Sequence, residues 1–503
     1  MRMTLVLLLA FTSLVHAAAT SGCAPADADG DGGTEGEGEG EGEGEGEGEG
    51  EGEGEGEGEG EGEGEGEGEG EGEGEGDCAA SVGTATFADA LSPTSELHVS
   101  ESGDDGTGDG SPGSPLRSIG AAVDAAIPGT AIVVHAGSYA GEFLSNLQGT
   151  ALAPMWLGGA PGEAKPVIAG GGEGLHLQRA RFAVIHDLIV TGATANGINA
   201  DDGGDVNDVS ASQFVVFEHL EIEDIGSGGN QDCLKLSGIN DFVVRNNSFQ
   251  SCSVGGSGVD MVGCHHGVIA RNTFALGGNA VQTKGGTTDI VVRANVVDGA
   301  NGRALNVGGS TGFEFFRPAL DAVAENAEAR RIFADANVII EAAEAIAFVG
   351  CVDCRAANNT ILFPTTRVFR ILQETVSTVD YSFAPASDSA VSNNLVVYTT
   401  AEIVNAGRML NIGANTDAAS FTFTNNLWYA TDDPSAAPAL PDVVEVGSIH
   451  GQDPAVDTGD ASDPRPQAGS PAIGAGVAVA GIDRDLTETC WLDPPSIGAL
   501  EVD

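Results

Sequence analysis

Short runs of Val and Ile, each followed by a polar pair and then by Asn and an apolar residue, recur along the chain. Three close copies span residues 243–249, 268–274 and 291–297. Weaker copies centre on Asp187, His219, Asn337, Asn359, Asn394 and Asn426. The shortest spacings between copies, 22 to 25 residues, fit one coil of three short strands and three turns. The pattern therefore predicts an all-β parallel β-helix, in which stacked coils share one buried interior.

The Asn of each copy is expected to stack on the Asn of the next coil, because side-chain amides at equivalent turns can hydrogen-bond along a solenoid. A second repeated segment precedes these copies by 9 to 14 residues in the closely spaced coils. Side chains alternate along a strand, so one set should point inward: Leu234, Val259, Val281, Leu305 and Ile346. The other set should form an outward column: Asn199, Lys235, Asp260, Gln282, Asn306, Ala347, Arg370 and Asn411.

The two ends of the repeat array have different patterns. Residues 78–128 are expected to form an N-terminal cap, with a strand at 97–100 and a short capping helix at 116–127 that stops at a Pro-Gly pair. A helix there would cover the open strand edge of the first coil. The β-helix itself is expected over residues 129–440, followed by a C-terminal β-helix tail over 441–503.

The end segments also carry a family resemblance. Residues 102–105, 115–123 and 128–139, together with 469–476 and 497–501, resemble the ends of bacterial right-handed parallel β-helix repeat proteins, the pectate-lyase-like superfold. The resemblance implies a right-handed, single-stranded helix. It leaves the activity open, because this fold carries lyases, hydrolases, epimerases and proteins that only bind.

The first 77 residues are expected to export and tether the domain. Residues 1–22 have the charged start, short apolar run and small-residue end of a signal peptide, and the run is too short to span a bilayer. The segment ending at Cys23 resembles a bacterial lipobox, which implies lipidation of that cysteine. Cleavage by ordinary signal peptidase at residues 17–19 is the alternative.

Residues 23–77 contain 21 consecutive Glu-Gly pairs and are expected to form a disordered linker, because the pairs offer nothing apolar to bury. A flexible linker suits a tethered domain. We therefore expect an outer-membrane or cell-surface lipoprotein that touches the membrane only through its lipid, or otherwise a secreted protein.

The chain is strongly acidic, with a formal net charge of −56. From Asp77 onward it still has 52 acidic and 19 basic residues. Such a surface disfavours nucleic acid and a broad electrostatic grip on polyanions, but it is compatible with a local basic site. We expect a monomer whose partner is a polysaccharide or a cell-envelope glycan, and no nucleic-acid partner.

A lipidated cysteine would leave seven others, an odd number. Cys351 and Cys354 are close enough for a local bridge, whereas Cys233 and Cys252 lie on opposite sides of one coil and can meet only if a turn folds back. The Cys-His-His run at residues 264–266 is expected to be a surface turn rather than a metal site, because it has no spaced fourth ligand.

The outward column contains the candidate chemistry. A Gln-Thr-Lys run ending at Lys284, followed by Asn295, resembles the lysine coil of the chondroitinase-B and alginate lyase group. The resemblance implies that Lys284 is a catalytic base. The group's catalytic Arg would fall near Val307 and its calcium-binding glutamates near Gly277 and Asn279, so no cofactor or metal ion is assigned.

Four further outward residues are candidates for binding substrate: Lys235, Asp260, Gln282 and Asn306. A polysaccharide lyase needs a base for the proton next to a uronate carboxylate and a cation that acidifies this proton. The alternative is that Lys284 is simply a solvated residue at the end of a strand.

Insertions at residues 201–213, 310–335 and 373–388 each follow the outward polar strand. All three should therefore leave one edge of the solenoid and wall the same face, where loops often carry function. Residues 319–332 in the middle insertion have a helical pattern. The alternative is that the insertions are tolerated surface loops without function.

Three hypotheses for function follow. The first is an exported, cell-surface β-helix module that binds a polysaccharide, with or without processing it. The second is a polysaccharide lyase that acts by β-elimination with Lys284 as base. The third is a structural or adhesive surface protein without catalysis.

Overall fold

The computed structural model describes residues 78, 85–226, 228–403, 406–457 and 463–502. All of them belong to one compact unit, residues 73–503. The predicted signal peptide, the lipidation site at Cys23 and the Glu-Gly linker lie outside the described residues.

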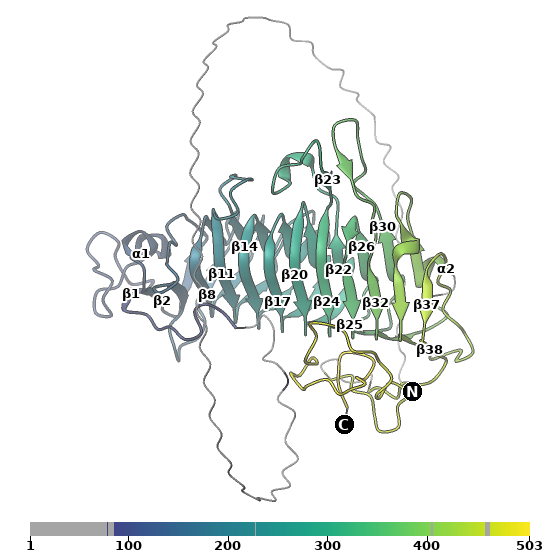
Figure 1. The fold of residues 1–503 in the computed structure, drawn as a ribbon. Coiled ribbons are helices and arrows are strands. Elements are labelled where there is room, and N and C mark those ends of the chain that lie inside the picture. The colour runs from purple at the N-terminus through teal and green to yellow at the C-terminus, as the bar shows by residue number, and fades with distance from the viewer. Residues whose placement is uncertain (1–77, 79–84, 227, 404–405, 458–462, 503) are drawn as a thin grey trace, which may run out of the picture. The chain divides into compact units, whose positions relative to one another are not determined.

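Nearly all described strands run parallel and belong to three sheets (Figure 1). Sheet 1 has 14 strands: β1 (Ser95–Val99), β2 (Thr130–Val134), β5 (Met155–Gly159), β8 (Arg181–His186), β11 (Ser212–Glu218), β14 (Ile239–Arg245), β17 (His265–Ala270), β20 (Thr287–Arg293), β24 (Ala329–Asp335), β27 (Cys351–Val352), β28 (Arg355–Ala357), β32 (Ala390–Ser392), β35 (Thr422–Thr424) and β37 (Val444–Val446).

Sheet 2 has 10 strands: β4 (Glu142–Leu144), β7 (Leu175–Gln178), β10 (Ile198–Asp201), β13 (Leu234–Ser237), β16 (Ser257–Val262), β19 (Asn279–Lys284), β22 (Arg303–Gly308), β26 (Glu344–Val349), β30 (Arg367–Leu372) and β34 (Leu410–Ile412). This sheet carries the predicted outward column.

Sheet 3 has 12 strands: β3 (Ser138–Ala140), β6 (Val167–Ala169), β9 (Ile189–Thr191), β12 (Glu221–Glu223), β15 (Ser248–Gln250), β18 (Thr273–Gly277), β21 (Val296–Ala300), β25 (Val338–Ile340), β29 (Thr360–Leu362), β33 (Leu395–Tyr398), β36 (Leu427–Ala430) and β38 (Ile449–His450). The described chain also contains β23 (Glu325–Asn326), β31 (Ser382–Phe383), the helices α1 (Ile119–Ala125) and α2 (Ala406–Met409), and the 3-10 turns Phe313–Phe315 and Ala418–Ser420.

Each coil places one strand in sheet 2, the next in sheet 1 and the third in sheet 3. Thus β13, β14 and β15 form one coil, and β16, β17 and β18 form the next. Every strand pairs in parallel with its equivalent in the neighbouring coil. The molecule is a single-stranded right-handed parallel β-helix, as the repeat and the family resemblance predict.

The interior of the solenoid is one continuous apolar core. The residues predicted to point inward from sheet 2 are all at most 2% exposed: Leu234, Val259, Val281, Leu305 and Ile346. Aromatic rings stack between coils as well, with the Phe249 and Phe274 centroids 4.9 Å apart. Each coil therefore buries its apolar side chains against the coils on either side, which a single coil could not do.

The predicted asparagine ladder is present at the turn between sheets 1 and 3. The Nδ2 atom of each Asn donates to the Oδ1 atom of the next at 2.9 to 3.0 Å, from Asn247 through Asn272, Asn295, Asn337, Asn359 and Asn394 to Asn426. The two earliest copies are misaligned by one residue. In the strand register, Asp187 and His219 are equivalent to Asn246, a turn residue with a positive φ of 56°. The ladder begins one position later, at Asn247.

The N-terminal cap contains the predicted strand as β1 and the predicted helix as α1. The observed helix, Ile119–Ala125, is shorter than the expected range of residues 116–127. Leu116 has an extended backbone, because its N–H donates to His98 O. Ser118 then caps the helix, its hydroxyl accepting from Ala121 N at 3.2 Å. Glu142 also caps it from the neighbouring coil, accepting from Ile119 N and Gly120 N.

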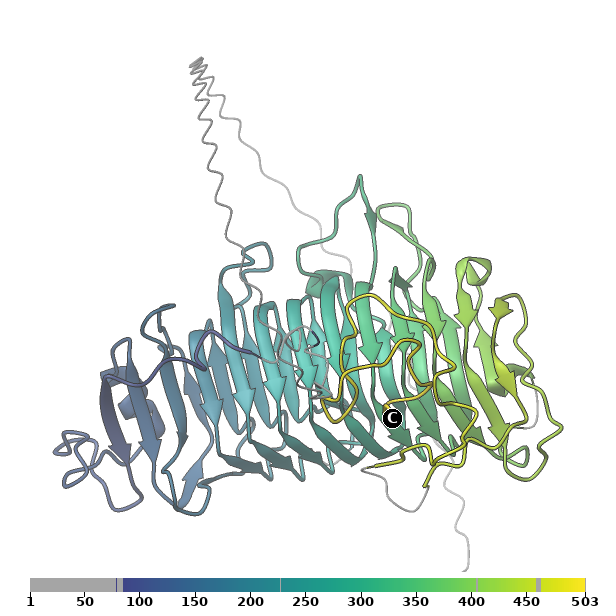
Figure 2. The ribbon, with the colours of Figure 1, turned by 60° about the horizontal axis from the view of Figure 1, so that its bottom comes forward.

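The C-terminal segment turns back along the solenoid after β38 (Figure 2). It has no strand among its described residues and is held by hydrogen bonds, such as Ala499 N to Thr360 Oγ1 at 2.9 Å and Asn358 Nδ2 to Ser496 O at 3.2 Å. A disulfide joins Cys490 in this segment to Cys78. Two cysteines separated by 412 residues are therefore covalently linked, which local sequence patterns did not predict.

The other disulfides match the sequence reasoning. Cys351 is bonded to Cys354, and Cys233 is bonded to Cys252, so the turn after β15 does fold back. The prediction of a surface turn at residues 264–266 is wrong. Cys264 is fully buried with a free thiol, and β17 begins at His265, which is only 9% exposed.

Among the described residues, no helix has both the length and the apolar character needed to cross a bilayer.

Candidate functional site

The outward column of sheet 2 has the predicted register. Lys235 in β13 pairs with Asp260 in β16, and Asp260 pairs with Gln282 in β19. The column runs through Asn199, Lys235, Asp260, Gln282, Asn306, Ala347, Arg370 and Asn411. The register also extends it at the N-terminal end to His176 in β7 and Phe143 in β4, which the sequence reasoning did not include.

Although the column points outward, the candidate residues do not form the single exposed surface that a glycan platform on this face would need. Asp260 is fully buried, Asn306 is 3% exposed and Lys284 is 9% exposed, while Lys235 and Gln282 are partly buried. Lys284 is therefore not a solvated residue at a strand end. Neighbouring outward side chains bind one another across the coils, and the insertions cover them from the side.

Four charged residues form a compact group, which we call the charged quartet: Asp232, Lys235, Asp260 and Lys284. Lys284 Nζ lies 3.1 Å from Asp260 Oδ2, and Lys235 Nζ contacts the same oxygen. Lys235 Nζ also lies 3.4 Å from Asp232 Oδ2. The Asp232 and Asp260 side chains are each 1% exposed, so two buried carboxylates support two lysines above them.

Asp232 was not among the sequence candidates. It lies on the turn before β13, where its Oδ1 accepts from Ser257 N at 2.7 Å. The signal that could have found it is its position three residues before Lys235, beside a strand of the polar face. Outward alternation alone missed it, because this Asp lies outside the strand.

The quartet has unusual electrostatics. Burial, together with the negative charge of Asp260, raises the pKa of Asp232 to about 7. Burial would also raise the pKa of Asp260, but the ammonium groups of Lys235 and Lys284 outweigh it and lower this pKa. Burial would lower the pKa of Lys235, yet the carboxylates of Asp260 and Asp232 raise it. Lys235 is therefore an ammonium at neutral pH.

A pocket of about 550 Å³ lies directly over the two lysines. Its lining is mainly hydroxyl, amide and charged groups: Gln178, Asn196, Asn199, Asp201, Asn230, Lys235, Ser237, Lys284, Ser310, Thr311 and Arg317, with Gly203, Gly204, Gly312, Val262 and Phe315. Asp232 and Asp260 do not line it. A ligand in the pocket would therefore meet the ammonium groups first, with the carboxylates beneath them.

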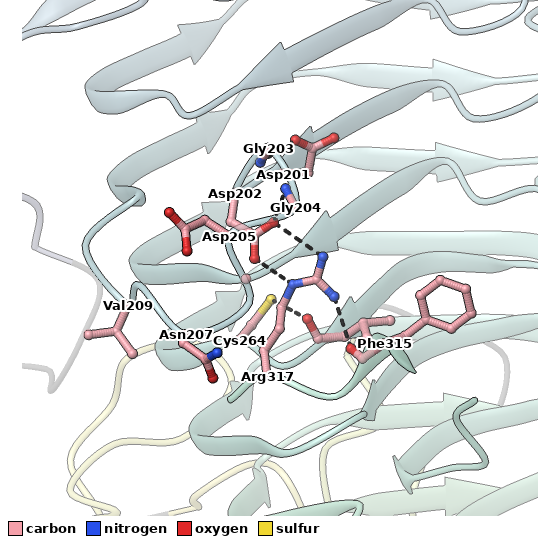
Figure 3. Close-up of polar contacts among 12 residues, drawn as sticks. Asp201, Asp202, Gly203, Gly204, Asp205, Asn207, Val209, Cys264, Phe315 and Arg317 are labelled. Carbon is pink, nitrogen blue, oxygen red and sulfur yellow. Dashed lines mark hydrogen bonds and ion pairs between the residues drawn. The ribbon is translucent and has the colours of Figure 1, made fainter. Parts of the chain in front are cut away.

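The first two insertions wall this pocket, as predicted. They leave the solenoid between sheets 2 and 1, at the edge above which β23 stands in Figure 1. Arg317 of the second insertion forms an ion pair with Asp202 of the first, with Arg317 Nε 2.6 Å from Asp202 Oδ2 (Figure 3). Arg317 Nη1 also donates to Phe315 O at 2.9 Å. The ion pair fixes a third cation at the pocket.

Glycines beneath the ion pair make room for it. Gly238 and Gly263 lie on successive turns with φ of 70° and 60°. A Cβ atom at Gly263 would come within 2.2 Å of the Arg317 Cβ, and one at Gly238 within 2.3 Å of Asp202 Oδ2. A glycine at each of these two positions therefore serves both the positive φ of the turn and the close approach of the ion pair.

The second and third insertions are joined to each other. Glu328 is fully buried and accepts from Gly285 N, Thr311 N and Thr311 Oγ1, each at 2.8 Å, and from Thr375 Oγ1. β23 pairs with β31 in the third insertion. The helix expected over residues 319–332 does not form, because β23 and β24 occupy this range and their backbone groups pair with other strands.

A second charged group lies further along the column. Glu344 contacts Arg303 at 3.3 Å, Arg367 at 2.6 Å and Arg370 at 2.7 Å. Burial would raise the pKa of Glu344, but hydrogen bonding and charge from Arg370 and the other guanidinium groups lower it. Arg303 Nη1 also donates to Asn306 Oδ1 at 3.2 Å, so Asn306 belongs to this group rather than to the quartet.

The position expected for a catalytic Arg by analogy with the lyase group is unsuitable. Val307 is 2% exposed and belongs to the apolar core. Arg317 reaches the pocket from an insertion instead, which no strand pattern could indicate. No group of three or more His, Cys, Asp or Glu side chains among the described residues is arranged to hold a metal ion.

No protein-family model and no curated protein matches the chain. Solved structures do resemble it at low identity. A lacto-N-biosidase from Eubacterium ramulus is 14% identical over 71% of this chain and 67% of its own, with a TM-score of 0.49. Pectate lyase Pel9A is 15% identical over 82% and 98%, with a TM-score of 0.47. An alginate lyase from Paenibacillus sp. str. FPU-7 is 18% identical over 66% and 95%, with a TM-score of 0.39. The fold of this chain rests on its own strand pairing.

Proposed function

We propose that the protein binds an acidic polysaccharide in the pocket over the charged quartet. One observation carries the proposal: three cations, Lys235, Lys284 and Arg317, line a single pocket of a strongly acidic chain. The chain contains only three lysines, and two of them are here. Each of these cations is paired with a carboxylate, and the cationic groups of the lysines and Arg317 face the pocket at fixed positions. Such an arrangement favours a ligand whose discrete negative groups match these positions over a grip on any polyanion.

The cations are held in place before a ligand arrives. Asp260 contacts both ammonium groups from below, and Asp202 holds the guanidinium of Arg317. A ligand carboxylate would meet charges whose positions are already fixed, so little side-chain entropy would be lost on binding. The remaining lining supplies hydroxyl and amide partners for sugar hydroxyl groups, and Phe315, 54% exposed, offers an apolar surface.

We propose in addition that the domain is exported and carried at the cell surface by a lipid on Cys23, as the leader and linker predict. A wall or capsule glycan would then be within reach of the pocket. Secretion after cleavage by ordinary signal peptidase is the alternative.

The direct test is a panel of neutral and acidic polysaccharides, assayed for binding to the wild type and to Lys235→Met. We expect binding of uronate-containing polymers and a loss of about 1.5–3 kcal/mol in the variant, the scale of a charged hydrogen bond. Lys165→Met is the matched control, because Lys165 pairs with Glu221 at 2.8 Å and does not line the pocket. Binding to neutral polymers alone, or equal losses in both variants, would exclude the proposal.

A second candidate function is β-elimination of the bound polysaccharide. It is favoured by the placement of Lys284 in the pocket beside two further cations. In this reaction a base takes the proton on C5, next to the uronate carboxylate, and the bond between C4 and the glycosidic oxygen breaks. The oxygen leaves with the bonding electrons and takes up a proton from water, and a C4–C5 double bond is left in the sugar. Lys284 would act as the base in its neutral amine form, after losing the proton with which it pairs with Asp260. Lys235 and Arg317 would stabilise the negative charge that develops on the carboxylate.

Lys284→Ala separates this reaction from binding alone. A lyase should lose turnover by about 10²-fold or more, the scale of a removed general base, while the variant stays folded at the assay temperature. Turnover is followed by the ultraviolet absorbance of the unsaturated product. If the wild type binds glycans but forms no such product, the protein is a binding module. If it binds none, the structural or adhesive hypothesis survives.

A further inference from the structure

Phenylalanine side chains that remain exposed are unevenly placed. Among the described residues, three phenylalanines are more than a third exposed: Phe143 at 55%, Phe315 at 54% and Phe313 at 37%. Phe315 lines the pocket, and Phe313 packs against Tyr381 and Phe383 beside it. Phe143 has no such cover from the insertions, yet it belongs to the same outward column of sheet 2.

Phe143 is continuous with the pocket through two polar residues. It pairs in register with His176, and His176 pairs with Asn199, which lines the pocket. Asn199 in turn pairs with Lys235. The ring of Phe143 therefore lies three strand spacings from Lys235 along the solenoid, about 14 Å.

The exposed ring is supported by a fixed neighbour. The Phe143 and His176 ring centroids are 4.8 Å apart with an interplanar angle of 90°. His176 Nε2 lies 2.6 Å from Asp201 Oδ2, and its Nδ1 lies 3.1 Å from Glu173 Oε2. Both imidazole nitrogens thus have a partner, which fixes the plane of His176 and holds one edge of Phe143. The Phe143 ring thus offers an apolar surface on which a sugar ring can stack, beside an imidazole that two carboxylates hold in place.

We infer that Phe143 and His176 form a second glycan subsite that stacks a sugar ring of the polysaccharide held in the pocket. The inference rests on the proposed function and adds to it a binding direction and a length requirement. The glycan lies along the solenoid axis, so that successive sugar units meet successive coils. Only a chain that spans about three coils from Lys235 reaches Phe143.

The test is the dependence of affinity on glycan length. Size-graded acidic oligosaccharides from polygalacturonate, alginate and chondroitin sulfate, of about two to eight units, are titrated calorimetrically into wild type and Phe143→Ala. We expect the wild type to bind long oligomers more tightly than short ones. Phe143→Ala should lose about tenfold for the long oligomers, the scale of one aromatic contact, and nothing for dimers.

Phe143→Tyr keeps the aromatic ring, so this variant should still bind long oligomers more tightly than short ones. Leu152→Ala is the matched control, since Leu152 is 88% exposed and does not belong to the outward column. Equal affinities of wild type and Phe143→Ala at every length would overturn the subsite, and so would an equal loss for dimers and long oligomers. If no oligomer of any length binds the wild type, the proposed function itself fails and the subsite with it.

Discussion

The asparagine ladder and the charged quartet are both columns of polar side chains stacked across successive coils, but they differ in how well they are satisfied. In the ladder, Asn272 donates from Nδ2 to Asn295 Oδ1 and to Val244 O, and its Oδ1 accepts from Asn247. In the quartet, burial and the charge of Asp260 raise the pKa of Asp232 to about 7. Asp260 Oδ1 has no hydrogen-bond partner within the described residues.

This difference indicates that the ladder serves the stability of the fold, whereas the quartet belongs to the candidate site. Neutral amides satisfy one another completely when they are buried, so the ladder can stabilise the fold without any ligand. Buried charges that are only partly satisfied cost stability, and such groups gather where a site needs them. The quartet opens onto a pocket, whereas the ladder is enclosed between sheets 1 and 3.

The largest expected effect comes from removing the shared carboxylate of the quartet. Asp260→Ala leaves Lys235 and Lys284 buried without their common partner and should destabilise the fold by about 3–5 kcal/mol. Chemical denaturation measures the loss. Asp298→Ala is the control, since Asp298 is exposed on β21, and it should change stability by less than about 0.5 kcal/mol. Equal midpoints for the two variants would show that the quartet lacks the buried pairing described here.

A smaller effect is expected from the ladder. Asn272→Leu removes hydrogen bonds to both neighbouring coils and should cost about 1–3 kcal/mol, because Asn247 and Asn295 are left partly unsatisfied. Glycan binding should not change, since the ladder does not touch the pocket. Asn301→Leu, at an exposed position, should leave the unfolding midpoint in place. A loss of glycan affinity in Asn272→Leu would contradict the separation of the two columns.

The smallest effect concerns pH. With a pKa of about 7 in the folded state and 3.8 as its ordinary value, Asp232 releases its proton more readily when the chain unfolds. Ionisation of Asp232 therefore favours the unfolded chain, and the free energy of unfolding falls as the pH rises from about 4 to about 7. Asp232→Asn removes this loss, so the stability of the variant relative to wild type should rise as the pH rises across that window, as denaturation at several pH values would show. A difference between the proteins that is independent of pH would contradict this assignment.

Local sequence was enough for most of what depends on period, apart from the one-residue misalignment at Asp187 and His219. Strand alternation placed Leu234 inside and Lys235 outside because the side-chain period of a strand is two, and a shift by one residue would have exposed the core. The recurring Asn predicted the ladder from Asn247 to Asn426, because equivalent positions of successive coils must stack. The insertions share an edge for the same reason, since each follows the same strand of its coil.

Tertiary structure decided what lies between coils and within the insertions. Lys284 is buried rather than solvated because Asp260, from the preceding coil, binds its ammonium group, and no pattern within one coil contains that contact. Arg317 lines the pocket because its insertion folds against Asp202. An insertion has no sequence repeat from which the position of a side chain could be predicted. The disulfide between Cys78 and Cys490 likewise joins segments that meet only after the solenoid has formed. Periodic features follow from backbone geometry, whereas burial, charge pairing and loop placement depend on neighbours that only the folded chain brings together.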